Sequence, residues 1–183
     1  MPHLFIAVAS ILVSAVAAVT DFRSGRIPNP LTITAMLFGF AIQGAFGGVA
    51  GAVESAVGLL ICAAVPGSAY WATKGAAIGG GDLKLFAALG ALLGPMHGLE
   101  VELSSFLLLG VFALFRLAYL GQLFCTAARS VRAVAGVFVP RLRNQIAEDS
   151  LVMTEMRMGP AIAVAVVTVL GLPAVLRWLP WLA

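Results

Sequence analysis

Charged residues are scarce in this sequence, and their scarcity excludes most soluble folds. Only 10% of the 183 residues are charged and 61% are hydrophobic, whereas soluble domains contain about 25% charged and about 45–50% apolar residues. Mean hydropathy is +1.05. The composition therefore predicts an all-α, polytopic membrane protein whose main partner is the lipid bilayer. In this setting the net charge of +3 indicates topology and not a nucleic-acid partner.

Cysteine and histidine are also rare, which argues against a disulfide framework or a metal site. The two cysteines, Cys62 and Cys125, do not form a CxxC pair, and His3 and His97 are isolated. Zinc sites and disulfide frameworks in proteins need clusters of such residues. We therefore expect no metal and no disulfide.

No Lys or Arg precedes Arg23. A secretory signal peptide begins with a basic region, so we expect the first apolar run to be a retained membrane helix. A helical crossing needs about 20 apolar residues, and about six such segments occur in the chain. We predict a single membrane-embedded domain over residues 1–183, with spans at about 4–20, 31–50, 55–72, 82–97, 103–120 and 159–176.

Basic residues are missing from every second connection between these spans. Arg23 and Arg26 follow the first span, whereas the connections on the opposite side contain acidic residues and no Lys or Arg: Glu54, Glu100 and Glu102. Basic loops of membrane proteins stay in the cytoplasm. The pattern therefore predicts that the basic connections are cytoplasmic and that both termini lie outside.

The longest polar segment, residues 122–157, combines apolar and basic side chains at roughly helical spacing. A cytoplasmic amphipathic helix between the fifth and sixth spans, lying on anionic lipid, would use both features. A solvated basic linker fits the same residues, and both interpretations stay open.

Two aspartates stand at the edges of apolar runs, where a carboxylate is costly and needs an explanation. Asp21 ends the first predicted span, and Asp82 begins the fourth, so the predicted topology places both at the cytoplasmic face. If the two carboxylates face each other, they cannot both ionise at low cost, and we expect them to share one proton. This is the working state of an aspartic protease, in which one carboxylate activates water and the other protonates the amide carbonyl.

The residues around the two acids are candidates for substrate binding. Gly79, Gly80 and Gly81 lack side chains and would let an extended substrate backbone approach Asp82 closely. Further candidates flank the two acids in the sequence: Lys84, Pro28 and Asn29.

These motifs resemble a known family. Asp21 followed by Ile27-Pro28-Asn29, together with Gly79-x-Gly81-Asp82, is similar to the prepilin peptidases, or type IV leader peptidases, of the GxGD class of aspartic proteases. The start of the last span, Met158-Gly159-Pro160, resembles the Gly-Pro-containing start of the family's last helix. The resemblance implies cleavage of the short basic leader from type IV prepilins or pilin-like proteins, at the cytoplasmic face of the bacterial inner membrane. Asp21 and Asp82 take the catalytic roles by motif position.

Longer members of that family carry a cytoplasmic domain with paired CxxC motifs and also methylate the new pilin N-terminus with S-adenosylmethionine. Because those motifs are missing here, the chain is similar to the short form, and we expect no cofactor. Two other functions fit the same sequence: an ion- or proton-coupled transporter component that uses the same acids, and a non-catalytic scaffold of a pilus or secretion assembly. Transport sites usually lie near the middle of the membrane, so two acids at one face favour the protease.

Overall fold

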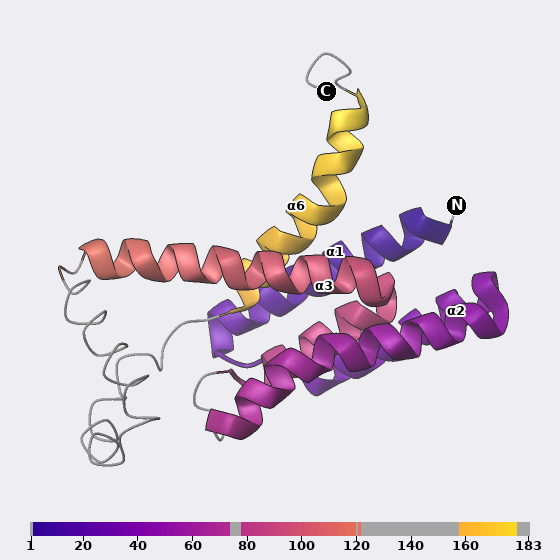
Figure 1. The fold of residues 1–183 in the computed structure, drawn as a ribbon, viewed down its shortest axis with the longest axis horizontal. Coiled ribbons are helices and arrows are strands. Elements are labelled where there is room, and N and C mark those ends of the chain that lie inside the picture. Colours follow the sequence, from indigo (N-terminus) through magenta and orange to yellow (C-terminus); the bar gives the residue numbers. More distant parts are fainter. Residues whose placement is uncertain (1, 74–77, 120, 122–157, 179–183) are drawn as a thin grey trace, which may run out of the picture. The chain divides into compact units, whose positions relative to one another are not determined.

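The computed structural model describes residues 2–73, 78–119, 121 and 158–178. The described regular structure is α-helical and runs in the order α1 (Pro2–Ser24), α2 (Asn29–Thr73), α3 (Gly80–Tyr119) and α6 (Gly159–Trp178) (Figure 1). The described residues up to 107 and from 158 onward belong to one compact unit, and residues 108–119 and 121 belong to a second. The segment predicted to be amphipathic, residues 122–157, lies outside the described residues.

Three of the helices, α1, α2 and α3, are long and apolar enough to cross a membrane. Many of their large apolar side chains point outward, for example Leu12 (60% exposed) and Leu37 (65% exposed). Continuous apolar faces of this kind are unusual on soluble proteins but suit contact with lipid. The predicted all-helical membrane class is therefore confirmed.

Single glycines break α2 and α3. Gly48 (φ 60°, ψ −144°) and Gly94 (φ 77°, ψ 178°) have non-helical backbone angles, which glycine adopts without the steric cost of a Cβ atom. As one unbroken helix, the 45 residues of α2 would extend about 68 Å at 1.5 Å per residue. That length is more than twice the hydrocarbon thickness of about 30 Å. The breaks also come earlier than the predicted connections, because residues 51–54 and 98–102 are helical.

The break in α3 is stabilised by side chains from both halves of α2. Pro95 has no N–H group, so the Ala91 carbonyl loses its intrahelical donor. The Ser55 hydroxyl donates to this carbonyl instead, over 2.8 Å. The Gln43 side-chain amide donates to the neighbouring Leu92 carbonyl, over 3.2 Å. Polar groups of α2 thus satisfy the backbone carbonyls at the turn of α3, as a membrane environment demands.

Small residues bring α2 and α3 into close contact. A Cβ atom on Gly58 would overlap the Gly90 carbonyl oxygen, and one on Gly39 would lie 2.7 Å from the Ala91 carbonyl. In lipid, helices associate by close packing and not by hydrophobic exclusion from water, so glycines at the contact favour association.

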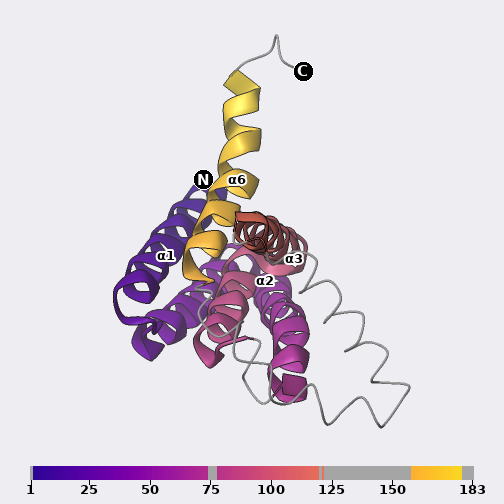
Figure 2. The ribbon, with the colours of Figure 1, turned by 90° about the vertical axis from the view of Figure 1, so that its left-hand side faces the viewer.

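The buried face of α1 is also built from small side chains, and it leads to Asp21. The helix packs against α2 and α6, and Figure 2 shows α6 beside it. α6 buries Ile162, Ala165 and Val166. Along α1, residues three or four apart share one face, and those on the buried face are Ser10, Ser14, Ala17 and Asp21.

The second unit is described at residues 108–119 and 121. It contributes the C-terminal part of α3, whose large apolar side chains are exposed, among them Phe112 and Phe115. Arg116 lies in the last turn.

Candidate active site

Asp21 is a buried acid in the last turn of α1. Only 7% of its surface is exposed. Its carboxylate oxygen Oδ2 accepts a hydrogen bond of 3.0 Å from the backbone N–H of Gly159, the first residue of α6. The first N–H groups of a helix have no intrahelical partner, so Asp21 satisfies one of them and joins α1 to the start of α6.

Only glycine fits at position 159. A Cβ atom there would lie 2.8 Å from Asp21 Cβ, 2.9 Å from Asp21 Oδ2 and 3.2 Å from Ala18 Cα. The first intrahelical bond of α6 runs from the Ile162 N–H to the Met158 carbonyl. Gly159 is a site residue that the sequence motifs do not identify, because its contact with Asp21 is visible only in three dimensions.

Asp82 is the third residue of α3, at the same site. Its carboxylate accepts a hydrogen bond from the backbone of Gly79, the residue before the helix, which is the reach-back arrangement of a capping box. The Asp82 side chain is half-buried. Its charge interacts with that of Asp21. The fold therefore brings the two predicted acids together from helices that are separate in sequence.

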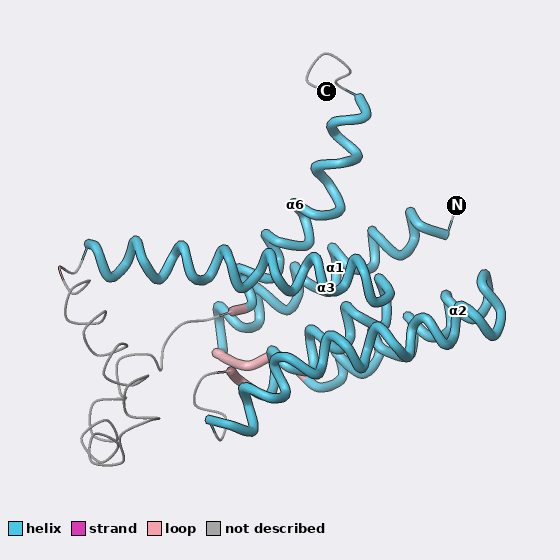
Figure 3. The backbone as a smooth tube through the Cα atoms, viewed as in Figure 1, coloured by secondary structure: helices cyan, strands magenta, loops and turns pink. Residues whose placement is uncertain are grey.

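The three glycines before Asp82 are engaged with the protein itself. A Cβ atom on Gly81 would lie 3.3 Å from Ile27 Cβ, and one on Gly80 would lie 3.8 Å from the Tyr70 ring. Ile27 is buried in the short loop that joins α1 to α2 (Figure 3). The missing side chain of Gly81 thus lets this loop pack on the start of α3. Close approach of a substrate to the glycines stays a prediction.

Two other predicted residues bind each other. The Lys84 ammonium donates a hydrogen bond of 2.8 Å to the Asn29 side-chain oxygen, so α3 is tied to the first residue of α2. Both side chains are exposed, as is Pro28. Their contact with substrate stays a prediction.

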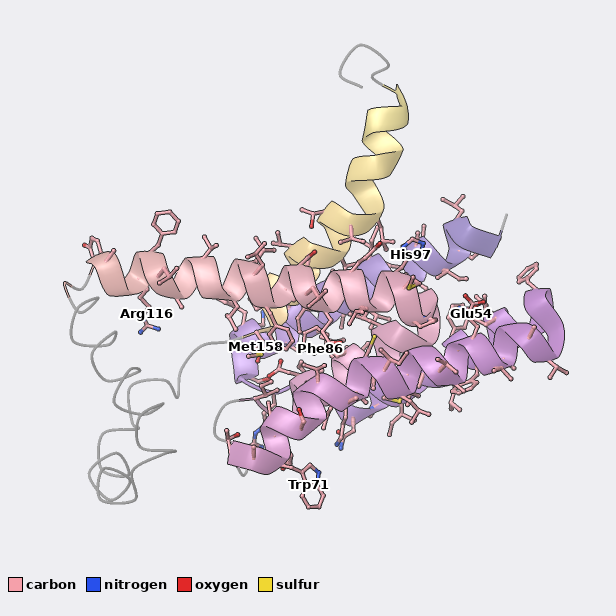
Figure 4. The ribbon with its side chains drawn as sticks, in the orientation of Figure 1. Glu54, Trp71, Phe86, His97, Arg116 and Met158 are labelled. Carbon is pink, nitrogen blue, oxygen red and sulfur yellow. The ribbon has the colours of Figure 1, made fainter. Side chains whose placement is uncertain are left out.

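The site lies at one end of the helices in the first unit. In Figure 4, Met158 and Trp71 lie toward one end of that unit, and Glu54 and His97 lie toward the other. Met158 directly precedes Gly159, which contacts Asp21. Across the part of the chain that the structure describes, no three His, Cys, Asp or Glu side chains gather closely enough to hold a metal ion.

Comparison with known proteins identifies a family. The sequence model of the type IV leader peptidase family matches residues 8–115, which is more than half of the chain and includes both Asp21 and Asp82. Searches among curated proteins and among solved structures gave no match.

Proposed function

Because the chain belongs to the type IV leader peptidase family, we propose that it is a membrane aspartic endopeptidase with Asp21 and Asp82 as its catalytic pair. Membership of a peptidase family favours a protease over the transporter component or scaffold. The geometry that supports this pair most directly is the packing of Ile27, in the loop after Asp21, against Gly81, the residue before Asp82, which leaves the two carboxylates close enough for their charges to interact. One comes from the end of α1 and the other from the start of α3.

The chemistry follows from two carboxylates that share one proton. The ionised carboxylate takes a proton from a water molecule as the water oxygen attacks the scissile carbonyl carbon. The protonated carboxylate donates its proton to the carbonyl oxygen. When the tetrahedral intermediate collapses, one of its hydroxyl groups returns a proton to the pair, the C–N bond breaks, and the amine nitrogen leaves with the proton that the pair took from water. The products are a carboxylic acid and an amine, and the pair again holds one proton.

Main-chain contacts hold both acids in place for this reaction. Gly159 binds Asp21, and Gly79 binds Asp82. Fixing reactive groups before the substrate arrives lowers the entropic cost of reaching the transition state. Asp82 is more exposed than Asp21, so the scissile peptide bond reaches the pair from the side of Asp82.

The substrate class is a prepilin or pilin-like protein, as the family description implies. We infer that its short basic leader is cut at the cytoplasmic face of the bacterial inner membrane. Exposed basic side chains next to the site support this location, because basic residues stay on the cytoplasmic side: Arg23, Arg26 and Lys84.

A single peptidase domain with six membrane crossings fits the helices best. The breaks at Gly48 and Gly94 divide α2 and α3 into two segments each, and α1 and α6 add one crossing each. Both termini then lie outside. In a cysteine-free variant, Ser24→Cys should react with a membrane-impermeant maleimide only after the cells are permeabilised. Gly47→Cys should react in intact cells, and the reverse pattern would contradict this topology.

Cleavage itself tests the function. Membranes containing the protein should shorten a prepilin from the same genome at one bond between the basic leader and the apolar helix. Asp21→Asn and Asp82→Asn should each stop this shortening at unchanged protein abundance. Normal processing by either variant would remove the proposed catalytic pair.

A further inference from the structure

A third carboxyl group, Glu102, is buried in the helices away from the catalytic pair. Only 1% of its surface is exposed. Neither of its carboxyl oxygens has a hydrogen-bond partner among the described residues. The hydropathy pattern predicts Glu102 in a connection between two spans. In the structure it lies inside α3, because the helix direction changes already at Gly94.

Contacts between the two segments of α3, before and after the break at Gly94, show how far along the helix Glu102 lies from Asp82. The rings of Phe86 and Phe106 lie 5.5 Å apart, and a Cβ atom on Gly98 would lie 3.0 Å from Gly90 Cα. The two segments of α3 therefore run side by side in opposite directions, and Glu102 is level with the stretch between Phe86 and Gly90. At 1.5 Å per residue, this level is about 9 Å farther along α3 than Asp82.

The group beside Glu102 is the thiol of Cys62. Cys62 is fully buried on α2, and its side chain packs into the contact between Gly90 and Gly98. The thiol lies against Gly98, and Glu102 is four residues farther along the same face of α3, so the thiol and the carboxyl group are neighbours, although neither carboxyl oxygen meets the geometry of a hydrogen bond. The buried hydroxyl one turn beyond Glu102, that of Ser105, donates to the Val101 carbonyl.

An ionised carboxylate in this position would have neither water nor a cation to stabilise it. Such a charge inside a membrane bundle is costly, and the carboxyl group avoids the cost by keeping its proton. Among the described residues, no basic side chain forms an ion pair with Glu102. Two basic side chains of α3 are exposed and bonded elsewhere, His97 to Glu100 and Lys84 to Asn29.

We propose that Glu102 and Cys62 form a second acid site, a neutral carboxylic acid beside a thiol, which is open to covalent modification by apolar carbodiimides. A carboxylic acid transfers its proton to a carbodiimide nitrogen, and the carboxylate oxygen adds to the central carbon to give an O-acylisourea. The Cys62 sulfur then attacks the acyl carbon, the C–O bond breaks, and the urea leaves with the thiol proton. The product is a thioester that links α2 to α3.

The site is separate from peptide hydrolysis and does not depend on the proposed catalytic pair. Glu102→Gln keeps the size and neutrality of the side chain, so we expect this variant to fold and to retain leader cleavage. Leader cleavage by Glu102→Gln therefore reports on the catalytic pair, and the spectroscopy and labelling of the same variant report on the Glu102 site.

Infrared spectroscopy tests the protonation. At mildly acidic pH, the difference spectrum between the wild-type protein and Glu102→Gln should show loss of the carbonyl band of a protonated carboxylic acid. The matched control is Glu100→Gln, on the same helix with an exposed side chain, which should remove a carboxylate band instead. Loss of a carboxylate band in Glu102→Gln would overturn the proposal.

Chemical labelling tests the pairing with Cys62. After N,N′-dicyclohexylcarbodiimide treatment of membranes, peptide mass spectrometry should find the peptides of Cys62 and Glu102 joined with loss of one water. Cys62→Ala should instead carry a stable N-acylurea on Glu102, and Glu102→Gln should carry neither product. A water-soluble carbodiimide should label Glu54 and Glu100 but not Glu102. An N-acylurea on Glu102 of the wild-type protein, without the joined peptides, would show that the thiol is not paired with the acid. If neither the joined peptides nor an N-acylurea forms at Glu102, the site is not open to carbodiimides and the proposal is wrong.

Discussion

The backbone N–H of Gly159 donates a hydrogen bond of 3.0 Å to the carboxylate of Asp21, across 138 residues of sequence. The contact joins the first residue of α6 to the last turn of α1. It also leaves no room for a side chain at position 159. The position of the Asp21 carboxylate therefore depends on a helix that is distant in the sequence.

Gly159→Ala tests this dependence. The new Cβ atom would displace Asp21, and we expect the cleavage rate to fall about 100-fold, the scale of loss when a catalytic group is misplaced by about 1 Å. The rate is measured with a prepilin in membranes at matched protein abundance. Gly171→Ala is the control, because the nearest atom to a Cβ there is 3.9 Å away, and it should cleave at the wild-type rate. Equal rates for both variants would show that Gly159 does not position Asp21.

The two acids should act as one unit. Asp21→Asn and Asp82→Asn should each lower the cleavage rate by roughly 100- to 10,000-fold, the range for loss of general acid–base catalysis. The double variant should be no slower than the slower single variant, because residues that act together are not additive. If the rate loss of the double variant equals the product of the two single losses, the two aspartates act in independent steps. Glu54→Gln, an exposed acid toward the other end of the unit, is the control and should leave the rate unchanged.

Lys84 and Asn29, which form a hydrogen bond with each other, could either hold α2 on α3 or contact the substrate, and variants distinguish these two roles. If they act by holding the start of α2 on α3, then Lys84→Met, Asn29→Leu and the double variant should lose a similar factor in kcat. This is the result we expect, because the two side chains already bind each other without substrate. Additive losses that appear mainly in KM would show instead that each side chain contacts the substrate independently.

Gly81→Val should abolish cleavage by pushing the loop at Ile27 away from the start of α3. A Cβ atom at position 81 already approaches Ile27 Cβ to 3.3 Å, and valine adds two methyl groups. Combining Gly81→Ala with Ile27→Ala should therefore recover part of the activity that Gly81→Ala alone loses. No recovery would favour the other interpretation, in which the glycine makes room for the substrate. The measurement is the cleavage rate of folded protein in membranes.

Ser55→Ala should destabilise the turn of α3 without changing the chemistry. The Ala91 carbonyl would lose the donor that replaces the missing Pro95 N–H, and we expect a loss of about 1 kcal/mol in the free energy of unfolding. Ser68→Ala is the control, since its exposed hydroxyl bonds only to its own helix. Unfolding in detergent measures the difference, and equal stability of the two variants would contradict the role given to Ser55.

The membrane class and the family were predictable from the sequence alone. Hydropathy is a property of local composition, so apolar runs indicate lipid-facing helices before any contact is known. The motifs around Asp21 and Asp82 are likewise short and local, and the family match includes both residues. Their catalytic roles stay predictions until the variants are measured.

Only the tertiary structure revealed where α2 and α3 break, which residue holds Asp21, and that Glu102 is buried. Gly48 and Gly94 are two of 20 glycines in the chain, and their backbone angles depend on the helices that pack around them. Gly159 and Cys62 become informative only through contacts with Asp21 and with Glu102. Such contacts join residues far apart in the chain and depend on how whole helices pack, which no local pattern encodes.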